Sequence, residues 1–174
     1  LRGLPALRRP VLGGLAAGVL AWGLAQGLVV ALQRDAPRLA SLHLSTLDGA
    51  PASPTSLTIT AGKPVVVNLW ASWCPPCRRE MPVLARAQAD HANVAVLMID
   101  QGEDARTVRA FLDSQGLRFG AVLLDPSSSA MRAYGSRGLP TTLFFDANGR
   151  LVASHVGEIT AARLEDVIGA RFGH

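Results

Sequence analysis

The sequence of residues 65–82 is VVVNLWASWCPPCRREMP. Residues 65–69 form a β-branched, apolar run, which is typical of a strand buried on both faces. The residues after the first cysteine are predicted to form a helix that begins near Cys74 and runs to about Ala89. The two cysteines of the chain, Cys74 and Cys77, therefore lie at a strand-to-helix junction.

The spacing of these cysteines favours thiol–disulfide chemistry. Residues i and i+3 of a first helical turn lie about 5–6 Å apart on one face, within reach of a disulfide. Unpaired N–H groups and the positive dipole end at a helix N-terminus favour a thiolate. We therefore expect Cys74, which is nearer the helix end and more exposed, to be a nucleophile with a lowered pKa, and Cys77 to be the resolving thiol. Pro75 and Pro76 suit this turn, where no intrahelical N–H bond is lost.

Other uses of the two cysteines are less favoured. A structural zinc site needs about four ligands, and two cysteines supply half of them. Soft thiolates suit Cu(I), so a copper site made by both thiolates and one histidine is the stronger alternative. An inert disulfide would restrain the unfolded chain little, because its loop is short. The histidines show no paired metal-ligand spacing; they are His43, His91, His155 and His174. We expect no organic or metal cofactor besides a redox-active disulfide.

The rest of the chain from residue 42 onward alternates strand and helix patterns. Strands are predicted near 42–47, 56–60, 94–99, 121–124, 141–145 and 151–156, and helices near 104–115, 125–134 and 160–169. Asn148-Gly149 favours a hairpin turn between the last two strands. This order predicts an α/β fold with a mixed sheet and helices on both faces.

Composition and charge limit the function classes. The chain has 174 residues, of which 49% are hydrophobic and 17% charged, so it is neither disordered nor collagen-like. Its formal net charge is +4. The excess comes from the flanks of one apolar segment, at Arg2, Arg8, Arg9 and Arg34. A nucleic-acid partner is therefore not expected.

That apolar segment, residues 11–32, contains no charged side chain. As a helix it would span roughly 33 Å, enough for a hydrocarbon core of about 30 Å. The arginines before it favour a cytoplasmic N-terminus. We thus predict a basic segment at 1–10, a transmembrane anchor at 11–32, a tether at 33–41 and a folded domain at 42–174. A cleaved signal peptide is the alternative, although its apolar region would be shorter.

Residues 70–82 and the later Gly138-Leu139-Pro140-Thr141-Thr142 resemble the thioredoxin superfamily. Together with GKPVVVN at 62–68 and the apolar N-terminal segment, they are most similar to membrane-tethered TlpA/ResA-like thiol–disulfide oxidoreductases. The resemblance covers roughly residues 42–169. It implies a thioredoxin-like fold with an N-terminal β extension.

The resemblance also implies roles for single residues. Pro140 matches a cis-proline that stands against the cysteine pair, and the backbone of Leu139 beside it would dock an extended substrate segment. Trp73 would flank the exposed thiol. Asn68 stands where thioredoxin has a buried aspartate, and it cannot accept a proton. Pro82 matches a proline that kinks the active-site helix.

Residues 101–124 look inserted relative to thioredoxin, which would add one helix and one strand. TlpA/ResA-like proteins have this insertion, and Glu103 matches a glutamate near the cysteines at its start. We hypothesise that Glu103, partly buried and raised in pKa, moves a proton to and from Cys77. The alternative is that Glu103 and Asp104 only begin a helix, where acids are favoured.

These features together predict an extracytoplasmic oxidoreductase at the inner membrane. Its partners would be disulfide-containing proteins and a membrane-embedded electron donor. The neutral Pro-Pro pair between the cysteines favours a reductase, with a potential nearer thioredoxin at about −270 mV than a strong oxidant at about −120 mV. A dithiol oxidase would use the same residues in the opposite direction.

Overall fold

The computed structural model describes residues 38–39, 42–57 and 60–173. The expected basic segment 1–10 and anchor 11–32 lie outside the described residues, as does most of the expected tether. Within these described ranges, no helix combines the length and the apolar character that a bilayer crossing requires.

The described residues form a seven-stranded mixed sheet in the order β2-β1-β5-β4-β3-β6-β7. The central strands β3, β4 and β5 are parallel, and every other neighbouring pair is antiparallel. The strands are β1 (Leu44–Thr46), β2 (Pro51–Ala52), β3 (Val65–Trp70), β4 (Ala95–Gln101), β5 (Ala121–Asp125), β6 (Thr141–Phe145) and β7 (Leu151–Val156). The predicted mixed sheet is confirmed.

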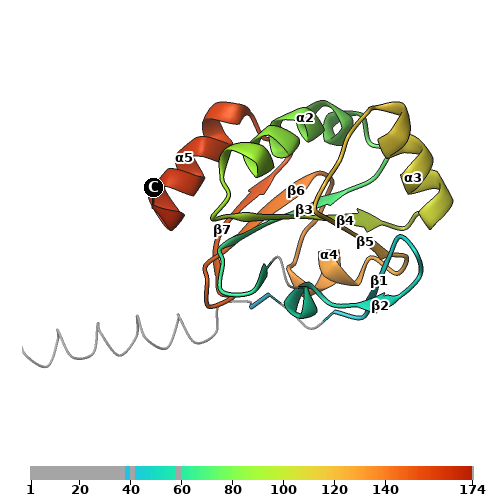
Figure 1. The fold of residues 1–174 in the computed structure, drawn as a ribbon, viewed down its shortest axis with the longest axis horizontal. Helices are drawn as coiled ribbons and strands as arrows, with labels where there is room; N and C mark the ends of the chain where they lie inside the picture. The colour runs from blue at the N-terminus through green and yellow to red at the C-terminus, as the bar shows by residue number, and fades with distance from the viewer. Residues whose placement is uncertain (1–37, 40–41, 58–59, 174) are drawn as a thin grey trace, which may run out of the picture. The chain divides into compact units, whose positions relative to one another are not determined.

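Helices cover both faces of this sheet, as predicted (Figure 1). The helices α2 (Pro75–Asp90), α3 (Ala105–Ser114) and α5 (Ala161–Phe172) lie on one face, and α4 (Ser129–Ala133) lies on the other. Side chains alternate along each strand, so the sheet contributes to two cores. Val66 packs in the core under α2, whereas its neighbour Val67 packs in the core on the opposite face.

Two aspartate side chains fix where two of the helices begin. Asp104 caps α3, because its carboxylate accepts a hydrogen bond from the Thr107 N–H at 2.9 Å. At the start of α4, the carboxylate of Asp125 accepts from the N–H groups of Ser129 and Ala130 at 2.9 and 2.7 Å. The acid expected to begin the helix near 104 is therefore Asp104 itself.

One predicted strand is wrong. Of the residues expected to form a strand at 56–60, Ser56 ends the 3-10 helix Pro54–Ser56, Leu57 and Thr60 lie in no strand, and 58–59 lie outside the described residues. The hydroxyl of Thr60 donates to the carbonyl oxygens of Pro54 and Leu57, at 2.9 and 2.8 Å. The second strand of the N-terminal hairpin is β2, earlier in the chain.

The helix and the strand expected within 101–124 are present as α3 and β5. The strand β5 lies between β4 and β1, so the N-terminal hairpin extends the sheet on that side. The chain leaves β4 at Gln101 and enters α3 through residues 102–104. This connection lies at the carboxyl end of the parallel strands, where α2 also begins.

Candidate functional site

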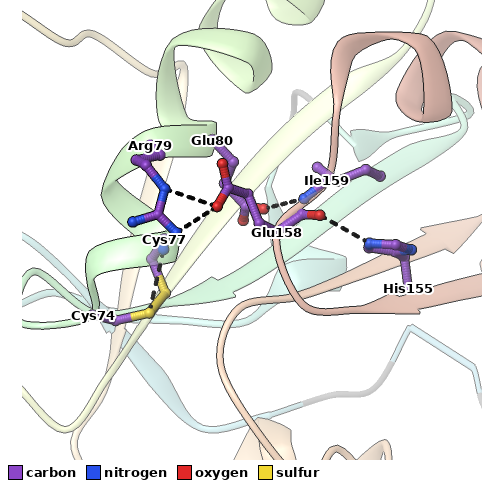
Figure 2. A network of polar contacts seen from close by, with 7 residues as sticks. All are labelled: Cys74, Cys77, Arg79, Glu80, His155, Glu158 and Ile159. Atoms are coloured by element: carbon purple, nitrogen blue, oxygen red, sulfur yellow. Dashed lines mark hydrogen bonds and ion pairs between the residues drawn. A yellow bond between two sulfur atoms is a disulfide. The ribbon is translucent and has the colours of Figure 1, made fainter.

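Cys74 and Cys77 form a disulfide at the beginning of α2 (Figure 2). Their Cα atoms are 5.3 Å apart, as expected for positions i and i+3. Cys74 is the N-cap residue of α2, and its sulfur accepts a hydrogen bond from the Cys77 N–H at 3.3 Å. A donor aimed at this sulfur would stabilise a thiolate there after reduction.

Cys74 is less exposed than the sequence suggests. Its exposed fraction is 4%, compared with 0% for Cys77. Cys74 is thus the more exposed of the two residues, as expected, but the surrounding segments cover most of it. Trp73 beside it is 66% exposed, so this indole is the prominent apolar group at the surface of the site.

The cis-proline loop lies against the cysteines, as the motif positions suggest. The Leu139–Pro140 peptide bond is cis. Leu139 and Gly138 line a cavity of about 470 Å³ together with Cys74, Trp73 and the two prolines between the cysteines. Residues about 65 positions apart in the sequence therefore enclose one space beside the disulfide.

The two intervening prolines occupy the first turn of α2. Pro75 and Pro76 stand at positions where an intrahelical N–H bond is not required. Because proline has no backbone N–H, the first amide of the turn that can donate toward Cys74 belongs to Cys77. The two prolines thus leave the Cys77 N–H as the donor to the Cys74 sulfur. Further along α2, Pro82 lies inside the helix.

The sequence prediction missed Glu80, which is the buried acid closest in sequence to Cys77. Its exposed fraction is 1%, and it stands one helical turn after Cys77 on the buried side of α2. One carboxylate oxygen accepts from Asn68 Nδ2 at 2.7 Å, and the other accepts from the Ile159 N–H at 2.7 Å. Burial raises the pKa of Glu80 to about 7, although both hydrogen bonds oppose the shift.

Asn68 supports this acid. Besides Glu80, its Nδ2 donates to Thr142 Oγ1 at 3.1 Å, so it connects the acid on α2 with β6. The Asn68 residue is completely buried. An uncharged donor at this position supports a carboxylate, whereas an aspartate would repel one.

An ion pair holds the Ile159 segment against α2 (Figure 2). Arg79 pairs with Glu158 at 2.6 Å between Nη2 and Oε2. The backbone oxygen of Glu158 also lies 3.2 Å from His155 Nε2. These contacts position the Ile159 N–H that bonds Glu80. Because both side chains of this ion pair are half-exposed, the pair adds little to the free energy of folding. Its effect is to orient the segment that contains Ile159.

Glu103 contacts the segment that precedes the cysteines. Its two carboxylate oxygens accept from the backbone N–H and the hydroxyl of Ser72, each at 2.6 Å. These bonds assign Glu103 to holding Ser72, two residues before Cys74. Its role in proton transfer with Cys77 stays a prediction.

A second buried acid, Asp100, lies behind Glu103. Asp100 accepts a hydrogen bond from the Glu103 N–H at 3.0 Å and is completely buried. Burial, together with its interaction with Glu103, raises the pKa of Asp100. The carboxyl end of β4 thus contains an acid that favours the protonated form.

The described ranges contain no group of three or more histidine, cysteine or acidic residues arranged to hold a metal ion. In this structure both sulfurs are joined to each other. The arrangement suits the gain and loss of two electrons by the sulfur pair. Glu80, one helical turn after Cys77, has a pKa of about 7 and can therefore gain or lose a proton near neutral pH.

Comparison with known proteins agrees with this site. The family model described as Redoxin matches residues 34–168. The thiol-disulfide oxidoreductase ResA of Halalkalibacterium halodurans is 35% identical over 107 residues, which are 60% of each protein. The thioredoxin-like protein YneN of Bacillus subtilis is 36% identical over 126 residues, 70% of this chain and 71% of that protein.

A solved structure is similar over most of the described fold. The putative thiol:disulfide interchange protein DsbE of Chlorobium tepidum matches with a TM-score of 0.68 and 28% identity, over 78% of this chain and 95% of that one. The resemblance to TlpA/ResA-like members of the thioredoxin superfamily is confirmed. The matched region spans about 60% of the length of the ResA relative.

Proposed function

The chain belongs to the Redoxin family, and from that premise we propose that it is a thiol–disulfide oxidoreductase acting on protein disulfides through Cys74 and Cys77. The observation that carries this proposal is the disulfide at the beginning of α2, placed beside the cis-proline loop. A helix N-terminus stabilises the thiolate that disulfide exchange requires.

The proposed reaction proceeds in two exchanges. The Cys74 thiolate attacks one sulfur of a substrate disulfide, so that a mixed disulfide forms and the other substrate sulfur leaves as a thiolate. Cys77 then loses its proton and attacks the Cys74 sulfur, which releases the second substrate thiolate. Two electrons pass from the protein to the substrate, and the Cys74–Cys77 disulfide is restored.

We propose that Glu80 accepts the proton that the Cys77 thiol loses. Cys77 is completely buried, so its thiol must lose a proton away from bulk water. Glu80 lies one helical turn further along α2 and has a pKa of about 7, which suits a general base at neutral pH. Asn68 and the Ile159 N–H fix the orientation of this carboxylate. We thus propose for Glu80 the same role that the sequence hypothesis gives to Glu103, whose part in the proton transfer stays a prediction.

The direction we propose is reduction of substrates. The Pro75-Pro76 pair provides no histidine to stabilise the Cys74 thiolate further, which favours a reducing potential, nearer about −270 mV than about −120 mV. A dithiol oxidase, which would run the same exchange in the opposite direction, is the alternative. We place this reaction outside the cytoplasm, with residues 11–32 as the membrane anchor. A membrane-embedded donor would then supply the electrons. These parts of the proposal rest on the apolar sequence at 11–32 and on the family.

Reduction of insulin by the chain of residues 1–174 in detergent tests this function. We expect turbidity from precipitated insulin chains with dithiothreitol as electron source, and none above background with Cys74→Ala. In Cys77→Ala, the substrate should stay attached to Cys74 and be identifiable by mass spectrometry. Arg118→Ala, on the exposed surface beside α3, is the control. Reduced protein that retains Cu(I) through dialysis and fails to reduce insulin would overturn the proposal.

A further inference from the structure

A second groove lies between the beginning of α2 and the end of α3, two helices on the same face of the sheet (Figure 1). Its volume is about 350 Å³. Three of its lining residues come from α2 and one is the C-cap of α3; they are Pro75, Arg78, Arg79 and Gln115. Pro75 lines both this groove and the cavity beside Cys74. The groove therefore begins next to the reactive cysteine.

Arg78 gives this groove a positive charge that no neighbouring acid neutralises. The other arginine in the wall, Arg79, pairs with Glu158 at 2.6 Å (Figure 2). Arg78 is exposed and forms no ion pair with any residue that the structure describes. Asp113, on the last turn of α3, pairs instead with Arg118 at 3.0 Å. Since no acidic side chain is among the described residues that line the groove, its wall has a net positive charge.

An aromatic ring, and not a carboxylate, orients the Arg78 side chain. Its guanidinium carbon lies 5.5 Å from the centroid of the Phe111 ring on α3. A guanidinium that stacks on a ring keeps its N–H donors available for a carboxylate, which it can bind through two parallel hydrogen bonds. The Arg78 N–H donates to the Cys74 carbonyl oxygen at 3.1 Å, so this cation stands one helical turn from the outer cysteine. The positive end of the α2 dipole also favours an anion here.

Resting on the proposed function, we propose that this groove binds an acidic side chain of the substrate, an aspartate or glutamate within about two residues of the substrate cysteine, and that Arg78 recognises its carboxylate. The mixed disulfide fixes the substrate cysteine at Cys74. Two residues of an extended segment span about 6–7 Å, which is comparable with the rise of about 5.4 Å per turn of α2. A lysine or arginine of the substrate in the same place would be repelled by Arg78.

Symmetric peptide disulfides test this preference. Each peptide contains one cysteine with two identical neighbours, either glutamate, glutamine or lysine, placed before the cysteine in one series and after it in the other. The reduced chain of residues 1–174, in nonionic detergent, converts one peptide disulfide into two peptide thiols and becomes the Cys74–Cys77 disulfide. The second-order rate constant is divided by that of dithiothreitol with the same peptide, which corrects for the intrinsic reactivity of each disulfide.

At low salt we expect glutamate peptides to react about threefold faster than glutamine peptides in at least one series, as one exposed ion pair allows, and lysine peptides to react slowest. The preference should disappear at about 1 M salt, where the Debye length is about 3 Å. In Arg78→Glu the order should reverse, so that lysine peptides react fastest. Arg86→Glu makes the same change of charge at an exposed position about two turns further along α2, and it should keep the wild-type order.

Equal corrected rates for glutamate and glutamine peptides in both series with the wild-type chain would overturn this inference and leave the proposed function intact. The wild-type order in Arg78→Glu, or a reversal in Arg86→Glu as well, would also overturn it, because the groove would then not set the order. Reduction of no peptide at all would overturn the proposed function itself. Each comparison is a ratio between peptides with one protein, so a change in the overall reactivity of Cys74 does not affect it.

Discussion

Replacement of Glu80 by glutamine tests the proton transfer from Cys77. The substitution keeps the size of the side chain and removes its ability to take a proton. With a pKa of about 7, Glu80 is half ionised at pH 7. At pH 5 only about 1% of it is ionised, since each pH unit below the pKa lowers the ionised fraction about tenfold.

The expected magnitude follows from these fractions. In the wild type, resolution of the mixed disulfide should become about 50-fold faster between pH 5 and pH 7 and then level off, because the base is fully ionised above its pKa. In Glu80→Gln, the rate at pH 7 should fall about 100-fold, the lower end of general-base effects. Its rate should rise with pH through Cys77 ionisation alone, with no inflection near 7.

The assay measures the lifetime of the mixed disulfide. Reduced protein is mixed with a substrate disulfide, the reaction is stopped by acid at set times, and the Cys74 adduct is counted by mass spectrometry. Asp90→Asn is the control, because this exposed acid at the other end of α2 pairs with Arg86 and has no contact with Glu80. Wild type and Glu80→Gln with the same rate and the same inflection would refute the role of Glu80.

Four further results are expected. Glu80 has a pKa of about 7 in the folded protein and about 4.5 in the unfolded chain, so the folded protein binds a proton that the unfolded chain has lost. The free energy of unfolding should therefore fall by about 3 kcal/mol between pH 4.5 and pH 7, and denaturant titrations should show no such fall in Glu80→Gln. Glu103→Gln should slow insulin reduction several-fold by loosening Ser72; an unchanged rate together with an unchanged Cys77 titration would exclude both roles considered for Glu103. Trp73→Ala should lower kcat/KM for insulin about tenfold at unchanged stability, because the indole is exposed. Equilibration with glutathione should give a potential nearer −270 than −120 mV, and a value near −120 mV would indicate an oxidase.

The local parts of the site could be predicted from sequence. The helix start at Cys74, the i to i+3 spacing and the place of Pro75-Pro76 depend on a few neighbouring residues and on the rules of a first helical turn. The cis bond before Pro140 was reached only through family resemblance, since an isolated proline does not reveal its isomer.

Glu80 was missed because its importance depends on distant residues. The acid stands on the apolar face of α2, next to Met81 and one turn before Leu84, which helical periodicity alone could have flagged. Its partners Asn68 and Ile159 lie 12 and 79 residues away, and no local rule joins them. Similarly, residues 56–60 have the composition of a strand, and the hydrogen bonds that the Thr60 hydroxyl donates are not evident from it.

The most direct measurement is the pH dependence of Cys74 alkylation in the reduced Cys77→Ala chain. The Cys74 sulfur lies at the N-terminus of α2, and the backbone N–H of residue 77 donates to it. Its rate of reaction with iodoacetamide should therefore rise with pH through a midpoint well below the pKa of free cysteine, which is about 8.5. A midpoint at or above the value of free cysteine would contradict a reactive outer thiolate and the exchange reaction that depends on it.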